Sequence, residues 1–155
     1  MPRKDPTRPY EIPGFRICLV REPGVALAER PELRTPATAA RVIAEYIGEA
    51  DREQFVVAML TIRHRLIGLN TVSVGCLSSS LVHPRECYKP AILAGAAGVL
   101  VAHNHPSGDP EPSAEDVSLT RRLAAAGTLL GIEALDHLVI GEHGRFVSLK
   151  ERGVL

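Results

Sequence analysis

Two histidines separated by a single residue are followed closely by a serine and an aspartate. His103 and His105 come at the end of an apolar run, and Ser113 and Asp116 follow a segment rich in proline and glycine. On an extended strand, positions i and i+2 point to the same side, so the two imidazoles can face one point in space. Two neutral imidazoles and one carboxylate leave a zinc ion with one open coordination position, which is typical of catalytic sites. The pattern therefore predicts a metal-dependent hydrolase.

Ser113 and Asp116 also have a simple structural interpretation. A serine followed three residues later by an acid, just before a helical run, is typical of a capping box. Capping and metal binding are compatible, because a carboxylate in the first helical turn is held rigidly and can still face outward to a metal. The histidine pair is harder to explain by packing alone, since a Pro-Ser-Gly turn follows it. We interpret His103 and His105 as metal ligands.

Amide hydrolysis also needs a group that moves protons. A zinc ion lowers the pKa of a bound water to about 7, and a carboxylate beside that water suits the transfer of its proton to the leaving nitrogen. Glu53, at the start of a predicted buried strand, is our candidate. Spacing alone does not single it out, because other glutamates compete with it: Glu45, Glu49, Glu86, Glu111 and Glu115.

The bulk composition predicts one soluble domain. The 155 residues are 45% hydrophobic and 23% charged, and the 18 Lys and Arg balance the 18 Asp and Glu. This balance argues against the basic surface of a duplex-DNA binder, although a local basic patch stays open. Cys18, Cys76 and Cys87 form no C-x-x-C pair, so we expect buried or half-buried free thiols in a reducing compartment.

The first residues predict a mobile arm rather than a targeting signal. Residues 1–13 hold four prolines and lack the apolar core of a signal peptide, so we place the folded domain at 14–155. The longest apolar stretch, 91–102, is too short to span a bilayer and is interrupted by glycines. We therefore expect a cytoplasmic protein with no membrane contact.

Helical and strand patterns alternate along the rest of the chain. Thr35 and Pro36 predict a helix start, with Gly48 at its end. A second helix is predicted from Pro84 to about Ala97. The other expected elements are strands at 15–20, 53–61, 66–74, 99–103, 135–140 and 145–149, and a helix at 113–130.

This alternation predicts the α/β class, with one sheet covered by helices. The strands at 53–61 and 66–74 are most simply a hairpin. Ligands in such folds gather where the carboxyl end of a strand meets the next helix. The segment from His103 to Asp116 lies at such a junction, which favours a site there independently of its residue types.

The whole set of residues resembles the JAMM motif of the JAB/MPN metalloprotease family. Glu53, His103, His105, Ser113 and Asp116 match its five positions without a gap or substitution. The resemblance is closest to the bacterial RadC branch and covers roughly residues 35–155. The segments that carry it are 81–86, 103–108, 135–141 and 147–149.

The resemblance implies a fold and a mechanism. The family fold is a three-layer domain, a curved mixed sheet between helices, related to cytidine deaminases. His103, His105 and Asp116 would hold Zn2+, and Glu53 would be the general acid and base. Ser113 would donate a hydrogen bond to the oxyanion. The implied substrate is a peptide or protein, cleaved at a peptide or isopeptide bond.

The sequence differs from its relatives in two ways, and these differences limit the functions that the resemblance implies. RadC proteins commonly have a helix-hairpin-helix-like N-terminal region, and residues 1–34 are too short to contain one, so DNA association credited to it is not implied. Insertions comparable to those that grip ubiquitin in deubiquitinating relatives are not recognisable either. The substrate and the oligomeric state therefore stay open.

Other classes of function fit the sequence less well. A DNA-repair or nuclease role and a non-catalytic MPN binding module remain as alternatives. A deaminase is disfavoured, because the H-x-E and P-C-x-x-C elements are missing. A non-haem iron oxygenase is disfavoured by the order of its ligands. We expect a structural or capping role for His83, with lining of the site as the alternative, and a core hydrogen-bonding role for His137. Solvated positions are expected for His64, His143 and the pair Arg121 and Arg122.

Overall fold

A single mixed sheet forms the centre of the protein. The computed structural model describes residues 12–24, 27, 29–75 and 82–155. The sheet has five strands in the order β2-β1-β3-β4-β5. Within the described residues the elements follow one another as α1 (Pro36–Ile47), β1 (Glu53–Leu60), β2 (Leu66–Gly75), α2 (Pro84–Leu93), β3 (Gly98–Asn104), α3 (Ala114–Leu130), β4 (Glu133–Ile140) and β5 (Phe146–Ser148).

The pairing of the strands is mixed, as the predicted class requires. β3 and β4 are parallel, whereas β1 pairs antiparallel with both β2 and β3, and β5 pairs antiparallel with β4. The predicted hairpin of β1 and β2 is confirmed, and its turn is closed by a hydrogen bond from Thr61 N–H to the carbonyl oxygen of Arg65 (2.9 Å). The parallel connection from β3 to β4 runs through α3, the usual βαβ arrangement.

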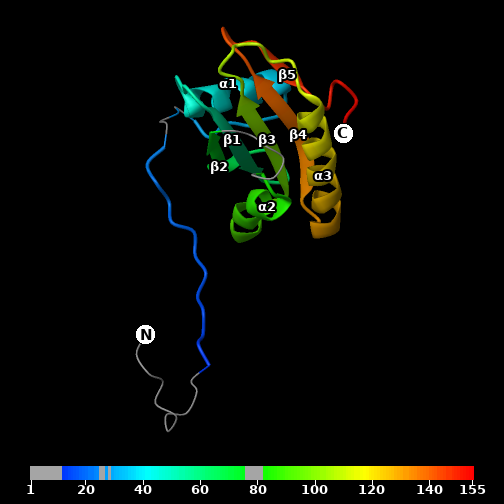
Figure 1. Ribbon diagram of the computed structural model, residues 1–155. Coiled ribbons are helices and arrows are strands. Elements are labelled where there is room, and N and C mark those ends of the chain that lie inside the picture. The colour runs from blue at the N-terminus through cyan, green and yellow to red at the C-terminus, as the bar shows by residue number, and fades with distance from the viewer. Residues whose placement is uncertain (1–11, 25–26, 28, 76–81) are drawn as a thin grey trace, which may run out of the picture.

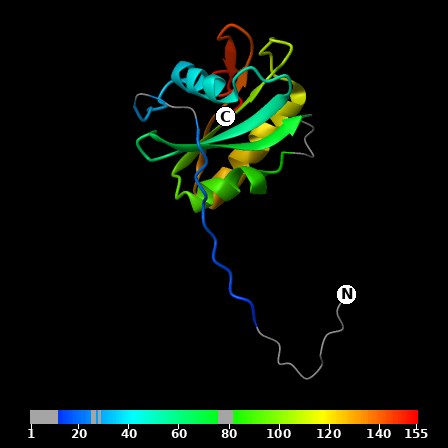
Figure 2. The same ribbon diagram turned by 90° about the vertical axis from the view of Figure 1, so that its left-hand side faces the viewer.

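Helices cover both faces of the sheet and give it three layers. Figures 1 and 2 show α1 on one face and α2 with α3 on the other. Residues from Phe55 to Leu60 are all buried, and they alternate between the two faces. Phe55, Val57 and Met59 pack in the cluster under α2 and α3, and the residues between them pack under α1. A central strand with both faces covered is apolar throughout.

The helix starts follow the sequence signals. The hydroxyl of Thr35 accepts a hydrogen bond from Thr38 N–H (3.2 Å), and Pro36 opens α1. The ring of His83 accepts a hydrogen bond from Arg85 N–H (3.1 Å), which confirms its predicted role as a cap of α2. The predicted end of α2 near Ala97 was too late. The helix stops at Leu93, because Gly95 adopts a positive φ of 64° that breaks the helical path.

The predicted strand at 15–20 is wrong. These residues form no helix or strand, and the side chains of Phe15, Ile17 and Val20 are exposed. Figure 1 shows this blue segment running away from the sheet. Alternating apolar residues do not make a strand where no neighbouring strand supplies hydrogen bonds or a covered face. In the described part of the chain, none of the helices combines the length and apolar character needed to cross a bilayer.

Candidate metal centre

The candidate centre lies at the carboxyl end of the central strand β3. His103 is the next-to-last residue of β3 and Asn104 is the last. His105 follows directly. Asp116 comes from the first turn of α3, the helix that leaves this end of the sheet. Two adjoining segments therefore bring the three side chains together. His103 is fully buried, and Asp116 is nearly so.

The ligand atoms of the three residues converge. One donor atom from each of His103, His105 and Asp116 lies within 4.8 Å of the others. The two Nε2 atoms are 3.0 Å apart, and His103 Nε2 lies 3.3 Å from Asp116 Oδ1. His105 Nε2 lies 3.8 Å from Asp116 Oδ2. The structure thus groups the residues that the sequence pattern assigned to a metal.

These spacings and this donor set fit a small divalent cation. Two ligand atoms of one tetrahedral zinc ion are roughly 3.3 Å apart, given bonds of about 2.0–2.2 Å. The three separations at the site, 3.0, 3.3 and 3.8 Å, lie around that value. Two nitrogens and one carboxylate oxygen are also ligands that zinc prefers. The group could therefore hold a metal ion without rearrangement of the backbone.

A backbone carbonyl fixes the orientation of His105. The Nδ1 atom of this ring lies 2.7 Å from the carbonyl oxygen of Asp109. A carbonyl oxygen only accepts, so Nδ1 carries the hydrogen and donates it. In a neutral ring the other nitrogen, Nε2, then has a lone pair. That lone pair faces His103 and Asp116, as a metal ligand requires.

The ring of His103 is held by a second, longer chain of contacts. Its Nδ1 atom lies 2.8 Å from Nε2 of His137, and Nδ1 of His137 lies 2.6 Å from the hydroxyl of Thr120. That hydroxyl donates to the carbonyl oxygen of Asp116 at 2.6 Å. The predicted core hydrogen-bonding role of His137 is confirmed. Complete burial lowers the pKa of His137 well below its usual value, and a proton on His103 would lower it further.

Asp116 combines helix capping with its place in the centre. Its Oδ2 accepts a hydrogen bond from Ser113 N–H (2.7 Å), and its own N–H donates to Ser113 Oγ (3.1 Å). The capping box predicted from the sequence is therefore present. Burial alone would raise the pKa of Asp116, but the interaction with His103 and the hydrogen bonds from Ser113 together hold it far below the usual range. Asp116 is thus a carboxylate at neutral pH.

Glu53 begins β1 at the same end of the sheet. Phe55 stands opposite His103 in the antiparallel pairing, so the residues that precede Phe55 approach the end of β3. Glu53 and Phe55 share a face of the sheet, and the Phe55 ring stacks on the His103 ring with centroids 6.1 Å apart. Glu53, the predicted general acid and base, therefore lies on the same face of the sheet as the candidate metal centre. Its catalytic role stays a prediction.

Asn104, which the sequence analysis did not single out, ties β1 to this place. Its side-chain oxygen accepts a hydrogen bond from Gln54 N–H (2.7 Å), and its side-chain nitrogen donates to the carbonyl oxygen of Arg52 (3.1 Å). These two backbone groups lie on either side of Glu53. No local sequence pattern marks this role of Asn104, because both of its partners are backbone groups about 50 residues earlier in the chain.

The turn between β4 and β5 braces the loop after His105. The carbonyl oxygen of Gly108 accepts hydrogen bonds from Glu142 N–H (3.0 Å) and from the guanidinium of Arg145 (2.8 Å). A Cβ at Gly141 would clash with that same carbonyl oxygen. The close approach therefore requires glycine, and it fixes the loop that supplies the Asp109 carbonyl to His105.

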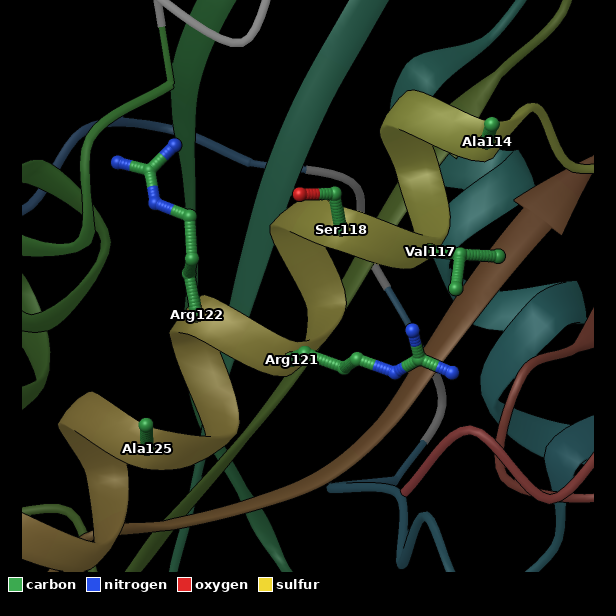
Figure 3. Close-up of a pocket in the computed structure, with 6 residues that line it drawn as sticks. All are labelled: Ala114, Val117, Ser118, Arg121, Arg122 and Ala125. Atoms are coloured by element: carbon green, nitrogen blue, oxygen red, sulfur yellow. The ribbon is translucent and has the colours of Figure 1, made fainter.

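The centre does not include four residues for which the sequence predicts solvated positions: His64, His143, Arg121 and Arg122. His143 is exposed in the β4–β5 turn, and His64 is half-buried in the β1–β2 turn. Arg121 and Arg122 lie on the exposed face of α3, as predicted. They line a shallow hollow of about 630 Å³, and Figure 3 shows their guanidinium groups extending in different directions from it. The buried face of the same helix carries Asp116 and Thr120, so this hollow is not part of the centre.

The cysteines match their prediction only in part. Cys87 is a buried free thiol, and burial raises its pKa to about 12, so it is inert at neutral pH. Cys18 is exposed, contrary to the prediction, because the segment around it does not pack on the sheet. The prediction for Cys76 lies outside the described residues.

The three-layer fold and the histidine and aspartate group at the end of β3 are those expected of a JAB domain. A comparison with protein families supports this directly, since residues 33–154 match the model described as "RadC-like JAB domain". The chain belongs to this RadC-like family. The match spans every described helix and strand of the domain.

Relatives from several bacteria are similar over most of the chain. The UPF0758 protein of Moorella thermoacetica is 51% identical over 126 residues, which are 81% of this chain and 55% of that protein. The UPF0758 protein of Desulfitobacterium hafniense is 49% identical over 126 residues, with the same shares. The UPF0758 protein of Rubrobacter xylanophilus is 49% identical over 140 residues, 90% of this chain and 59% of that protein. The chain thus spans little more than half the length of these relatives.

Proposed function

We propose that the protein is a zinc-dependent hydrolase that cleaves peptide or isopeptide bonds in a peptide or protein substrate. The observation that carries this proposal is the convergence of three ligand atoms, from His103, His105 and Asp116, within 4.8 Å at the end of the central strand. A site of two imidazoles and one carboxylate leaves room for a reacting group, whereas structural zinc sites are closed by a fourth protein ligand. Membership of a JAB family agrees with this chemistry.

His103, His105 and Asp116 would hold the zinc ion. When bound, zinc polarises a carbonyl oxygen and makes a water ligand acidic near neutral pH. The low pKa of Asp116 keeps its carboxylate ionised, which suits ligation of a cation. The Asp109 carbonyl turns the Nε2 atom of His105 toward the same point.

Glu53 and Ser113 would carry out the proton transfer and the charge stabilisation. Glu53 would accept a proton from the attacking water and deliver it to the leaving nitrogen. Ser113 Oγ accepts a hydrogen bond from Asp116 N–H, which places its hydroxyl hydrogen beside the Asp116 carboxylate. That hydrogen would be donated to the substrate oxygen as negative charge develops on it.

Zinc analysis of purified protein tests the metal centre. We expect about one zinc per chain, and loss of that zinc in His105→Ala and Asp116→Asn. Asn can still accept the hydrogen bond from Ser113 N–H, so Asp116→Asn removes the ligand charge but keeps the cap. The exposed variants His143→Asn and Glu115→Ala serve as controls and should keep the metal. Equal zinc content in all five proteins would refute the centre.

A hydrolysis assay tests the chemistry. The zinc-loaded protein is incubated with a mixture of linear peptides and isopeptide-linked peptides, and the products are identified by mass spectrometry. Glu53→Gln should keep the zinc and lose roughly 10²- to 10⁴-fold in turnover, the usual contribution of a general base. The exposed Glu49→Gln is the matched control. Unchanged turnover in Glu53→Gln would remove Glu53 from the mechanism.

Two outcomes would favour the alternative functions. A protein that binds zinc and cleaves none of these peptides would favour a non-catalytic MPN binding module. Tight binding to duplex or branched DNA that weakens steeply with salt would favour a role on nucleic acid.

A further inference from the structure

His137 is a fully buried histidine that the proposed reaction does not use. It lies on β4, with one ring nitrogen against His103 and the other against Thr120. Core histidines are costly unless both nitrogens find partners, and here the partners themselves lead to the metal centre. Hydrogen bonds link the backbone of Asp116 to Thr120, His137 and His103 in turn. The donor and the acceptor of each bond can be assigned by starting from Asp116.

The carbonyl oxygen of Asp116 sets the first direction. It lies 2.6 Å from Thr120 Oγ1, and because a carbonyl has no hydrogen to give, the hydroxyl must donate. A hydroxyl has only one hydrogen. At its 2.6 Å contact with His137 Nδ1, the Thr120 oxygen must therefore accept, so Nδ1 of His137 carries a hydrogen.

The second direction follows from the first. His137 is buried completely, and an isolated buried imidazolium is strongly disfavoured. A neutral ring with a hydrogen on Nδ1 has a lone pair on Nε2. At the 2.8 Å contact with His103 Nδ1, His137 therefore accepts and His103 donates.

We propose that Thr120 and His137 act as positioning residues that keep the hydrogen of His103 on Nδ1, so that its Nε2 lone pair faces Asp116 and His105 and can bind a metal ion. This inference rests on the proposed metal centre. The two histidine ligands are thus oriented by different means: His105 by the carbonyl of Asp109, and His103 through a second histidine and a threonine. The Phe55 ring, also fully buried, packs against His137 in a T-shaped arrangement with centroids 5.5 Å apart.

If these hydrogen bonds ran in the opposite direction, His103 could not bind a metal ion through Nε2. If Thr120 donated to His137, then His137 would donate from Nε2, and His103 would carry its hydrogen on the nitrogen that faces the other ligands. The carbonyl of Asp116 favours the productive direction. Because the residue that supplies this carbonyl also supplies the carboxylate ligand, the first turn of α3 sets both the third ligand and the orientation of the first.

The tautomer of His137 in the unaltered protein is the primary test. Nitrogen-15 NMR of the full chain, recorded after chelator treatment and again after zinc addition, distinguishes a protonated ring nitrogen from a bare one. We expect His137 to carry hydrogen on Nδ1 and a bare Nε2 in both states. A hydrogen on Nε2 of His137, in either state, overturns the inference.

Zinc affinity in variants is the second test. Thr120→Val removes the acceptor for His137 with little change of shape and should weaken zinc binding about 10- to 100-fold, as for other residues that support metal ligands. Thr120→Ser keeps the hydroxyl and should restore the affinity. Thr128→Val is the matched control, since its hydroxyl makes the same type of bond along α3, to Ala124 O, away from the centre. Affinity is measured by competition with a chromophoric chelator.

The outcomes separate this inference from the proposed function. If the unaltered protein binds no zinc, the metal centre fails, and the positioning role, which rests on it, fails with it. If zinc binds but Thr120→Val matches the unaltered protein in affinity, the metal centre stands and the positioning role is overturned. If Thr120→Val does not fold, the spectrum of the unaltered protein decides alone.

Discussion

At the scale of single residues, the centre depends on which atoms donate and which accept. His105 donates from Nδ1 to a carbonyl oxygen, so its other nitrogen faces inward with a lone pair. Asp116 receives a backbone hydrogen bond on one oxygen and presents the other to His103. Each ligand is held from outside the site before any ion enters. Such preorganisation reduces the cost of binding a cation.

Ser113 carries two roles that one substitution can separate. Its oxygen caps α3, and its hydroxyl hydrogen is the proposed oxyanion donor. Replacing a serine cap by glycine costs only a few tenths of a kcal/mol, whereas losing an oxyanion donor costs about 10²- to 10³-fold in turnover. Ser113→Gly should therefore unfold at nearly the same temperature but hydrolyse peptides far more slowly.

The neighbouring serine on the exposed face of α3 provides the comparison. Ser118→Ala should retain both stability and turnover, because Ser118 lies away from the centre. Calorimetry and initial rates with the same peptide measure the two effects. A Ser113→Gly protein that turns over as fast as Ser118→Ala would show that Ser113 only caps the helix.

Among the secondary-structure elements, the start of β1, the end of β3 and the start of α3 together form the site. β3 and the residue that follows it supply the two histidines, α3 supplies the aspartate, and β1 supplies Glu53. Only β1 comes from a distant part of the sequence, and the Asn104 side chain holds it through Arg52 and Gln54. The placement of Glu53 therefore depends on one buried amide.

Asn104→Ala should loosen the start of β1. It removes two hydrogen bonds and leaves their backbone partners unmatched, which should cost about 1–3 kcal/mol in the free energy of unfolding. Amide hydrogen exchange should accelerate at Gln54, and peptide turnover should fall because Glu53 is less well placed. Asn70→Ala, on the exposed side of β2, is the control. Unchanged exchange at Gln54 would contradict this role for Asn104.

The sequence predicted those features of the fold and the site whose residues lie close together along the chain. The helix starts at Thr35 and Ser113, the hairpin and the metal group all have short-range signals, and the structure shows each of them. The roles of Thr120 and Asn104 depend on contacts with β4 and β1, which no local pattern contains. The strand expected at 15–20 failed for the same reason, since a strand needs partners that its own residues do not specify.

In the whole molecule, an apolar cluster packs on each face of the sheet, and the site lies at the edge of one of these clusters. The cluster under α2 and α3 reaches the centre through Phe55, whose ring contacts both His103 and His137. The rigid core therefore extends to the ligands themselves. The chain covers 55–59% of the length of the relatives described above, so activities of those whole proteins are proposals for this one.

Residues 29–33 attach the N-terminal side of the domain to the hairpin. Arg30 donates to the carbonyl oxygen of Leu66 (2.6 Å), Leu33 N–H donates to the carbonyl oxygen of His64 (2.8 Å), and the Leu33 side chain is buried. The predicted boundary between arm and domain at residue 13 stays a prediction. These contacts indicate that stability depends on the chain from residue 29 onward.

Two truncated proteins test where the stable unit begins. A chain that starts at residue 29 should melt within a few degrees of the full chain. A chain that starts at residue 35 loses a buried leucine, which should cost about 2–5 kcal/mol, and its melting temperature should fall by roughly 5–15 °C. Calorimetry of the three proteins decides. Equal stability of the two truncated chains would show that residues 29–33 contribute nothing.

Anomalous diffraction at the zinc absorption edge would show whether His103, His105 and Asp116 bind one zinc ion. Crystals of the protein grown with zinc should show one strong anomalous peak about 2.0–2.2 Å from Nε2 of both histidines and from an oxygen of Asp116. A peak bound elsewhere, or zinc-grown crystals in which Asp116 lies beyond bonding distance of the ion, would show that these three residues do not form a zinc centre.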